Sequence, residues 1–500
     1  MGSPIDDLSF QARLQPNRLA VVDLATIRRW SYHELDSSVA RCVRVFVEHF
    51  GLRTGDRVAA LAKNSATLLI VHLACARCGL IYVPLNWRLS GAEIFALLAD
   101  SEPAVLIVGS SDDGIGTVAR RVDVNDLQAS IDATMPSWPD RRDDYLPSLI
   151  LYTSGTSGRP KGVLLSEHNL EQTAMNFGLL GRVSSRSVFL VDSPMFHIIG
   201  LVTSLRPPLR HGAGILISDG FDPARTLGRL ADEVLSVTHY FCVPQMAAAL
   251  RKAPGYDPAK LHGLTAIFTG GAPHSAANIR AWLADGLSIV DGFGMSEAGT
   301  VFGMPIDRTV IERKAGCVGI APPWVEVRLV NDFGEDCPDD VAGELLLRGA
   351  NITRGYWRRP DESAKAFTAD GWFRTGDIAT RDSDGFYRLV DRKKDMFISG
   401  GENVYPAEIE ALLATIDGLQ EFAVIGVPDE QWGEVGHAVI VVAQGFSVSG
   451  ESIKAQLATR LARYKIPKHI TFIDALPRTG SGKVLKNALR EQLAGRPWSR

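Results

Sequence analysis

A short stretch rich in hydroxyl groups and glycine lies between two apolar segments of the chain. Its members are Thr153, Ser154, Gly155, Thr156, Ser157 and Gly158, with Lys161 three residues further on. The hydroxyl groups are hydrogen-bond donors, the glycines let backbone N–H groups face one point, and the lysine adds a fixed positive charge. These residue types at this spacing indicate a loop that binds phosphate.

The loop does not match the template of the P-loop nucleotide hydrolases. Counting from Gly155, Pro160 stands where the second glycine is required, and Gly162 stands where a Ser or Thr would hold Mg²⁺. Lys161 alone falls in its expected place. We therefore expect a different kind of phosphate site, with a flexible Ser/Gly surface loop as the alternative.

The segments around the loop alternate between helical and strand-like patterns. This alternation runs through residues 1–145 and resumes over residues 187–294. Strands that alternate with helices predict parallel sheets covered on both faces, here in two α/β layers. Ser31, with Glu34 three residues later, forms a capping box and predicts the start of an amphipathic helix over residues 31–49.

The pattern changes in the last third of the chain. From about Gly316 apolar residues alternate with period two between Gly- and Asp-rich turns, which predicts an antiparallel sheet or a small β-barrel. A charged run then precedes a helix that begins near Pro406, in a smaller α+β unit. We predict a large α/β N-terminal domain over residues 1–390 and a C-terminal domain over residues 391–500.

Length and composition restrict the class of protein. A chain of 500 residues exceeds one ordinary core, and a net charge of −4 gives no reason to expect nucleic acid or an anionic membrane as partner. Six Cys residues without a recognisable export signal favour reduced thiols and the cytoplasm.

The most apolar run, residues 67–85, contains His72 and Pro84 and predicts a buried helix followed by a strand rather than a membrane span. Within it, His72, Cys75 and Cys78 have helical spacing. They lack a second pair of ligands, so we interpret them as core residues and not as a metal site.

Four segments together resemble one enzyme family. They are "YTSGTSGRPKGV" at residues 152–163, "DGFGMSEAG" at residues 291–299, residues 371–410, and "LPRTGSGKVLK" at residues 476–486. In this order and at these separations they are similar to the acyl-adenylate-forming enzymes, which include acyl- and aryl-CoA synthetases, firefly-type luciferases and the adenylation domains of peptide synthetases. The resemblance implies the fold of that family, a mobile C-terminal domain, and the use of ATP, Mg²⁺ and coenzyme A.

The resemblance also implies roles for individual residues. Lys483 would bridge the acyl carboxylate and the α-phosphate, and so reduce the repulsion between two anions. Glu297 would hold Mg²⁺ next to Ser296, which replaces the more usual Thr, and His197 would stand at the mouth of the acyl pocket. The residues expected along the nucleotide and acyl group are Gly270, Gly271, Ala272, Pro273, Asp291, Gly292, Phe293, Gly294 and Met295. Phe293 takes the place of a common Tyr.

A second set of implied residues lies towards the C-terminus. Asp377 would accept both ribose hydroxyls, and Arg392 would approach the same sugar. Asp391 matches the hinge of the family. After adenylation the small domain would turn about it, withdraw the catalytic lysine and bring Gly400 and Gly401 next to the pantetheine arm of coenzyme A.

The acid and its acceptor are constrained less closely. The segments expected around the acyl group are mostly apolar, and a dicarboxylic acid would require a second cation, for which His274 and Arg280 are the nearest candidates. We therefore expect a hydrophobic acid: fatty, aryl, or polycyclic terpenoid or steroid. Coenzyme A is the expected acceptor, because no carrier-attachment segment is recognised.

Several alternatives remain open. The chain could be a stand-alone adenylating enzyme that loads a carrier protein, a luciferase-like oxygenase, or an inactive homologue that acts as a binding protein. It could be a monomer or a homodimer. Acylation of Lys483 is a hypothesis for an off-switch, because it would remove the charge that adenylation requires.

Overall fold

The fold is that of a computed structural model of the chain. The described residues are 6–109, 120–139, 143–153, 160–272, 274–392, 395–399, 402–429, 432–461, 463–478 and 484–493. The chain forms two compact units, the first comprising Met1–Glu326 and Leu347–Phe373 and the second Val327–Leu346 and Arg374–Arg500. The domain boundary near Asp391 stays a prediction, because contacts within one arrangement do not test where a hinge lies.

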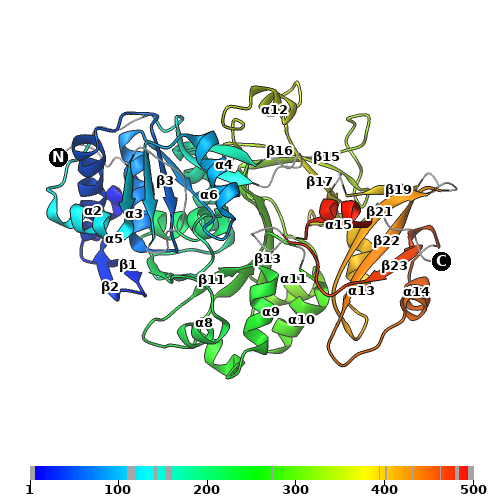
Figure 1. Ribbon diagram of the computed structural model, residues 1–500. Helices are drawn as coiled ribbons and strands as arrows, with labels where there is room; N and C mark the ends of the chain where they lie inside the picture. Colours follow the sequence, from blue (N-terminus) through cyan, green and yellow to red (C-terminus); the bar gives the residue numbers. More distant parts are fainter. Residues whose placement is uncertain are drawn as a thin grey trace. The chain divides into compact units, whose positions relative to one another are not determined.

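Two sheets with parallel inner strands form the first unit (Figure 1). The eight-stranded sheet consists, in spatial order, of β14 (Gly299–Gly303), β13 (Ile289–Met295), β12 (Ala266–Thr269), β11 (His239–Cys242), β9 (Val188–Val191), β10 (Gly214–Ile217), β1 (Leu19–Asp23) and β2 (Arg28–Ser31). The six-stranded sheet consists of β6 (Arg121–Asp123), β5 (Val105–Val108), β3 (Arg57–Leu61), β4 (Ile81–Pro84), β7 (Pro147–Thr153) and β8 (Lys161–Ser166). The two predicted α/β layers are confirmed, with antiparallel edge strands β2, β14 and β8.

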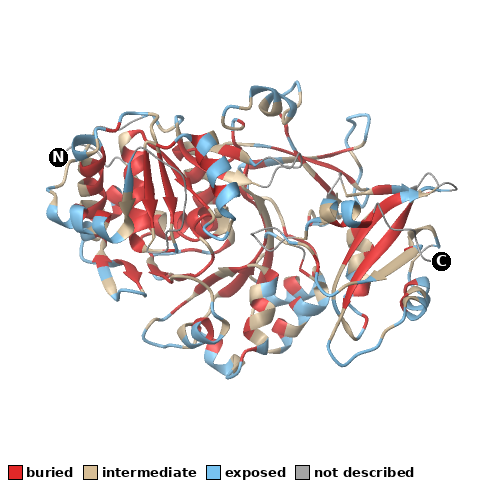
Figure 2. Cartoon of the chain, viewed as in Figure 1, coloured by how far each residue is buried: buried red, intermediate tan, exposed pale blue. Residues whose placement is uncertain are grey.

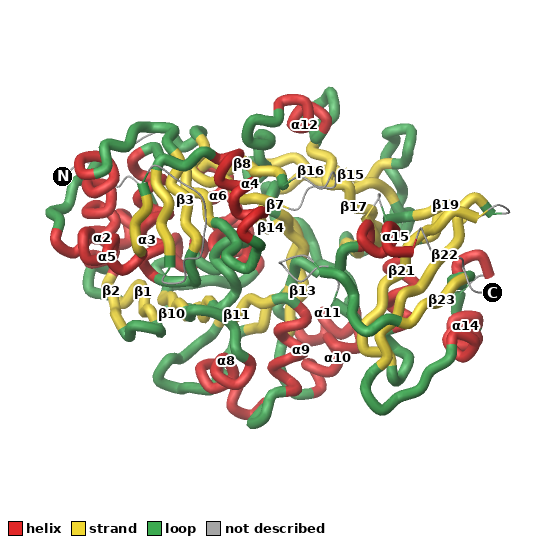
Figure 3. The backbone as a smooth tube through the Cα atoms, in the orientation of Figure 1, coloured by secondary structure: helices red, strands yellow, loops and turns green. Residues whose placement is uncertain are grey.

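Helices lie on and between these sheets (Figure 3). They are α1 (Asp7–Leu14), α2 (Tyr32–Arg44), α3 (Ala66–Cys78), α4 (Gly91–Ser101), α5 (Val124–Ala133), α6 (Glu167–Leu180), α7 (Arg206–His211), α8 (Pro223–Leu230), α9 (Pro244–Lys252), α10 (Ala276–Ala284), α11 (Arg308–Arg313) and α12 (Pro360–Lys365). α3 contacts β4 and β7 of one sheet and β1 of the other, and α6 contacts β8 and β14. Both helices therefore lie between the sheets.

The position of α3 explains its composition. A helix that is apolar on all sides must be buried on all sides, and α3 has buried residues along its whole length. His72 and Cys75 are buried there, and among the described residues no group of three or more His, Cys, Asp or Glu side chains could hold a metal ion. None of the helices in the described part of the chain has the length and apolar character that crossing a membrane requires.

Local signals in the sequence also agree with the structure. α2 begins directly after Ser31, whose side chain accepts from the Glu34 N–H while the Glu34 carboxylate accepts from the Ser31 N–H. This reciprocal pair satisfies two donors that the first helical turn would otherwise leave without a partner. The predicted capping box is therefore confirmed, and α2 runs from Tyr32 to Arg44 before a π-helical turn.

The second unit contains a five-stranded sheet covered by helices. Its members are β20 (Glu402–Val404), β19 (Phe397–Ser399), β22 (Gly433–Val442), β21 (Leu419–Asp429), β23 (His469–Phe472), α13 (Pro406–Leu413), α14 (Gly450–Ala458) and α15 (Lys486–Leu493). Residues of β21 and β22 alternate between a core with α13 and α14 on one face and a core with α15 on the other. Both strands are therefore buried on both faces, as Figure 2 shows.

The remaining strands form an antiparallel sheet that links the two stretches of the second unit. Its order is β15 (Val325–Val330), β16 (Gly343–Gly349), β17 (Phe373–Arg381) and β18 (Tyr387–Arg392). The predicted period-two strands are present. Since the order ends at β15 and β18, these described strands form a sheet with two edges, and the small barrel that we considered is not closed by them.

Candidate active site

The hairpin of β7 and β8 fixes both ends of the predicted phosphate loop. Thr153 and Lys161 are register partners, and the Thr153 hydroxyl donates to the Lys161 carbonyl oxygen at 3.4 Å. The loop residues Ser154, Gly155, Thr156, Ser157 and Gly158 lie outside the described residues. The strand pair nevertheless places Lys161 at the start of β8, at the end of the loop.

The side chain of Lys161 is held by two residues that the sequence analysis missed. It forms an ion pair with Glu362 of α12, and its Nζ lies 5.3 Å from the ring centroid of Tyr356. An ammonium group over an aromatic face is attracted by the ring quadrupole. No motif marks Tyr356 or Glu362, since both contacts form only when distant segments pack.

Glu297 lies in the tight turn between β13 and β14, close to the same tyrosine. Its Oε1 accepts a hydrogen bond from the Tyr356 hydroxyl at 3.2 Å, and its carbonyl oxygen accepts from the Thr353 N–H at 2.7 Å. The residue is 9% exposed, and Ser296 precedes it half-buried. A single hard carboxylate suits Mg²⁺, which proteins bind through one or two carboxylates together with substrate phosphates. The residues present therefore fit the ion.

A buried polar cluster lies at the end of β12, where Thr269 pairs with Asp291 of β13. Asp291 accepts a hydrogen bond from the Thr269 hydroxyl at 3.0 Å, and the same hydroxyl lies 3.0 Å from Nδ1 of His274. Burial raises the pKa of Asp291 to about 8, against the opposing effect of the Thr269 hydrogen bond. Burial also lowers the pKa of His274 to about 4. At pH 7 burial therefore favours the neutral form of both groups.

His274 and Arg280 are the two residues that the sequence offered as cations for a second carboxylate. His274 is uncharged, and Arg280 is half-exposed and paired with Glu312 at 2.9 Å. Neither supplies a buried positive charge for a second carboxylate. The expectation of a hydrophobic acid stays a prediction.

A small apolar cavity of about 20 Å³, room for about one water molecule, lies next to Asp291, between α6 and β11–β14. Its aromatic lining consists of Phe177, Phe241 and Phe268. The Phe177 ring centroid lies 5.0 Å from that of Phe268 and 5.7 Å from that of Phe241. These rings pack against one another, and the cavity is too small to hold an acid in this structure.

The turn after β12 approaches the same region. Gly271 has φ +80, and a Cβ added there would lie 3.3 Å from Cδ1 of Ile199 and 3.9 Å from Cγ1 of Val243. Both conformation and space therefore favour glycine at this point. His197 is half-buried two residues before Ile199. Ala272 is described, whereas Pro273 lies outside the described residues, and the roles of all these residues stay predictions.

The glycines of "DGFGM" have a structural reason of their own. A Cβ on Gly292 would lie 2.8 Å from the carbonyl oxygen of Phe302, and one on Gly294 would collide with that of Gly299. Both belong to the close antiparallel pair of β13 and β14, where Met295 is opposite Gly299. The Phe293 ring lies 5.9 Å from that of Phe302. Strand packing alone thus requires these glycines, and their contact with a nucleotide is untested.

The second unit brings the predicted ribose and hinge residues together on β17 and β18. Asp377 is buried, its N–H donates to the Thr375 hydroxyl at 3.0 Å, and Arg392 is its register partner. Asp391 accepts a hydrogen bond from the Ala407 N–H at 2.9 Å, in the first turn of α13. Gly400, Gly401 and Lys483 lie outside the described residues.

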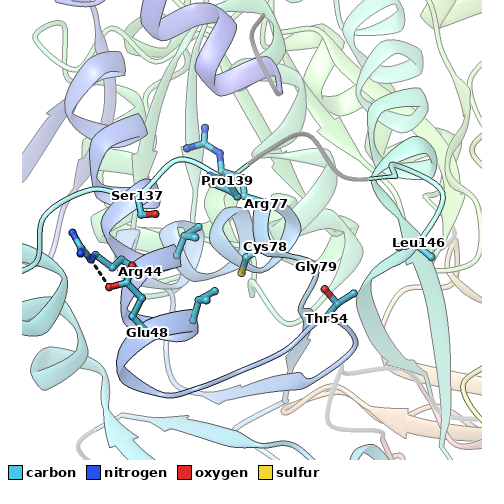
Figure 4. A pocket seen from close by; sticks show the side chains of 11 residues that line it. Arg44, Glu48, Thr54, Arg77, Cys78, Gly79, Ser137, Pro139 and Leu146 are labelled. Carbon is cyan, nitrogen blue, oxygen red and sulfur yellow. Dashed lines mark hydrogen bonds and ion pairs between the residues drawn. The ribbon is translucent and has the colours of Figure 1, made fainter. Parts of the chain in front are cut away.

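A groove elsewhere on the first unit contains none of the predicted residues. It lies between α2 and the end of α3 (Figure 4). Its charged lining residues already have partners, since Arg44 pairs with Glu48 at 2.8 Å and Arg77 with Asp6 at 2.6 Å. The groove therefore offers no unmatched charge to a ligand.

Comparison with curated proteins gives relatives along nearly the whole chain. A feruloyl-CoA synthase of Amycolatopsis sp. is 40% identical, over 96% of this chain and 97% of that protein. An indoleacetate–CoA ligase of Aromatoleum aromaticum is 36% identical, over 97% and 96%. A long-chain-fatty-acid–CoA ligase of Mycobacterium tuberculosis is 34% identical, over 96% and 97%.

Solved structures agree with these relatives. ATP-bound MatB from Rhodopseudomonas palustris matches with a TM-score of 0.90 at 31% identity, over 98% of this chain and 99% of that chain. The o-succinylbenzoate-CoA synthetase of Bacillus subtilis, in complex with ATP and magnesium, matches with a TM-score of 0.87 at 28% identity, over 97% and 99%. The predicted fold and enzyme class, an acid–CoA ligase, are confirmed at this level.

The family models complete the comparison. The model described as AMP-binding enzyme matches residues 8–357, and the model described as AMP-binding enzyme C-terminal domain matches residues 408–483. The first match includes the segments at residues 152–163 and 291–299, and the second includes residues 408–410 of the third segment and residues 476–483 of the fourth, with Lys483 at its end. The chain therefore belongs to the AMP-binding enzyme family.

Proposed function

We propose that this enzyme is an ATP-dependent aryl-CoA synthetase, which converts an aromatic carboxylic acid to its coenzyme A thioester. The observation that carries the adenylation chemistry is the placement of Lys161 and Glu297 on either side of Tyr356, with a ring contact of 5.3 Å and a hydrogen bond of 3.2 Å. A fixed cation and a hard carboxylate beside one loop are what the phosphates of ATP and their Mg²⁺ require.

The first half-reaction joins two groups of like charge. A carboxylate oxygen of the acid attacks the α-phosphorus of ATP, and the bond from that phosphorus to pyrophosphate breaks. Lys161 offsets the charge of the departing phosphates, and Lys483 reduces the repulsion between carboxylate and α-phosphate. Glu297 would hold Mg²⁺, which neutralises phosphate charge when bound. Asp377 and Arg392 would position the ribose.

The second half-reaction replaces AMP by the thiol. The sulfur of coenzyme A attacks the acyl carbon, the bond from that carbon to the phosphate oxygen breaks, and AMP leaves as the thiol proton is lost to solvent. We propose that Asp391 is the hinge about which the second unit turns between the two steps, so that Gly400 and Gly401 replace Lys483 beside the acyl group.

The aromatic substrate is supported by the relatives. Burial lowers the pKa of His274, so this residue offers little positive charge to a second carboxylate at neutral pH, which favours an acid with a single carboxylate. Two of the relatives named above act on acids with an aromatic ring. A long-chain fatty acid is the second candidate, because another relative is a fatty-acid ligase.

A panel of acids tests both parts of the proposal. Pyrophosphate exchange is measured with hydroxycinnamic, indoleacetic, benzoic and straight-chain fatty acids, followed by AMP release with and without coenzyme A. We expect kcat/KM for the best aromatic acid to exceed that for the best fatty acid by about tenfold or more, a difference of about 1.4 kcal/mol. A preference for fatty acids would overturn the substrate, exchange without thioester would favour a carrier protein, and no exchange would overturn the function.

A further inference from the structure

Residues 351–357 are attached at one end to the turn that carries Glu297. The side-chain amide of Asn351 donates to the carbonyl oxygen of Ala298 at 2.7 Å. The Thr353 N–H donates to the carbonyl oxygen of Glu297 at 2.7 Å. These two buried hydrogen bonds fix the segment relative to the β13–β14 turn.

At its other end the same segment is attached to β8, the strand that begins with Lys161. The Leu164 N–H donates to the Gly355 carbonyl oxygen at 3.0 Å, and the Trp357 N–H donates to the Gly162 carbonyl oxygen at 2.7 Å. Tyr356 lies between these two bonds and forms an isolated β-bridge with Val163. Its backbone is therefore fixed relative to both functional residues.

The side chain of Tyr356 contacts both Glu297 and Lys161. Its hydroxyl donates to Oε1 of Glu297 at 3.2 Å, while its ring faces Nζ of Lys161 at 5.3 Å. A hydrogen bond to a carboxylate is charge-assisted and restricts the rotation of that carboxylate. One rigid aromatic side chain thus contacts the group expected to hold the metal and the group expected to hold the phosphates.

We propose that Tyr356 is a positioning residue that couples magnesium binding to phosphate binding. Its hydroxyl orients the Glu297 carboxylate towards the metal, and its ring keeps the Lys161 ammonium beside the phosphates. The inference rests on the proposed function, in which ATP binds with Mg²⁺ at this site. It assigns separate tasks to the hydroxyl and to the ring, so the two tasks can be tested apart.

Tyr356→Phe removes the hydroxyl and keeps the ring. The affinity for ATP is measured by calorimetry over a series of Mg²⁺ concentrations and, separately, with EDTA. For the Phe variant we expect the Mg²⁺ concentration at half-saturation to rise about tenfold, which corresponds to about 1.4 kcal/mol, with unchanged affinity in EDTA. For Tyr356→Leu, which removes the ring as well, we expect weaker ATP binding in EDTA too.

Tyr256→Phe is the matched control. Tyr256 donates a hydrogen bond to the Asp285 carboxylate at 2.6 Å, in the same unit but in contact with neither functional residue. We expect its Mg²⁺ titration to match that of the wild type, and the unfolding temperature of each variant reports any general loss of stability.

An unchanged titration for Tyr356→Phe, or the same shift in Tyr256→Phe, would overturn the role of the hydroxyl. Unchanged binding in EDTA for Tyr356→Leu would overturn the role of the ring. If the wild type itself bound no Mg²⁺–ATP, the proposed function would fail rather than this inference alone.

Discussion

At the scale of single residues, Asp291 is a carboxyl group with an unusual proton affinity. It is buried as the third residue of β13, and the Thr269 hydroxyl donates a hydrogen bond to its Oδ1. Desolvation penalises the charged form more than the hydrogen bonds from Thr269 and from the Gly292 backbone favour it, so the pKa rises from 3.8 to about 8. The folded protein therefore binds a proton that the unfolded chain has released at neutral pH.

That difference predicts how stability depends on pH. Between about pH 4 and pH 8 the native state holds one more proton at Asp291 than the unfolded state, so the free energy of unfolding falls as pH rises. Asp291→Asn cannot lose a proton. We expect the variant to gain stability relative to the wild type by up to about 1.4 kcal/mol per pH unit in this window, measured by urea unfolding from pH 5 to pH 9.

Asp192 supplies a matched comparison. It is also buried, but the hydroxyls of Thr226 and Tyr240 donate to its two oxygens at 2.6 and 3.0 Å, and its pKa rises to about 6. The relative gain of Asp192→Asn should therefore end about two pH units earlier than that of Asp291→Asn. Parallel stability curves for the wild type and Asp291→Asn between pH 6 and pH 8 would contradict the assignment.

The same residues show what sequence could predict about the site. Lys161, Glu297 and Asp291 stand in short motifs, so their residue types and spacing were sufficient to select them. Tyr356 contacts Glu297 across 59 positions of sequence, and an isolated tyrosine in an irregular segment has no periodicity that would mark it. Its importance follows from tertiary contacts, which no local pattern contains.

At the scale of elements, the buried strands were predictable and their partners were not. β21 and β22 are apolar because both faces are covered, a pattern visible as continuous apolar runs. By contrast, β1 belongs to the sheet formed mainly by residues 188–303, where it pairs in parallel with β10. Pairing between segments so far apart depends on packing of the whole unit, so the sequence alternation assigned this strand to no particular sheet.

A second element-scale feature is the contact between β18 and the start of α13. Asp391, at the end of β18, accepts a hydrogen bond from the Ala407 N–H, one of the helix donors that lack a partner within α13. A negative charge at this end also interacts favourably with the helix dipole. Asp391→Ala should lower the free energy of unfolding by about 0.5–2 kcal/mol, as measured by urea unfolding.

Ser449→Ala is the control for this change, because Ser449 caps α14 of the same unit by accepting from the Ser452 N–H at 3.2 Å. Both variants lose one acceptor at a helix start and should lose similar stability. If Asp391 is also the hinge, its variant alone should change the rate of thioester formation from preformed acyl-AMP. Equal effects of both variants on that rate would assign Asp391 a purely structural role.

At the scale of the whole molecule, the sequence pattern predicted that the structure changes near Asp391, but it did not predict the limits of the compact units. The charged run near Asp391 suggested a boundary there, whereas the contacts assign Val327–Leu346 and the strands from Arg374 onwards to the second unit. Antiparallel strands join residues by tertiary hydrogen bonds, so a unit can begin well before the sequence changes in character. A hinge is defined by comparing two arrangements of the units, so its position has to be found by experiment.

The rates of the two half-reactions test whether the second unit turns between them. Lys483 is expected to act while the carboxylate attacks the α-phosphate. Lys483→Ala should therefore lower the rate of adenylation by about 100-fold or more, as measured by pyrophosphate exchange. Thioester formation from preformed acyl-AMP should be retained, since a different face of the second unit would then adjoin the acyl group. Lys486→Ala, which removes a half-buried ion pair with Glu410 at 2.8 Å within the second unit, should spare both steps. Equal loss of the two half-reactions in Lys483→Ala would mean that one arrangement of the units serves both, and the proposed rotation would be wrong.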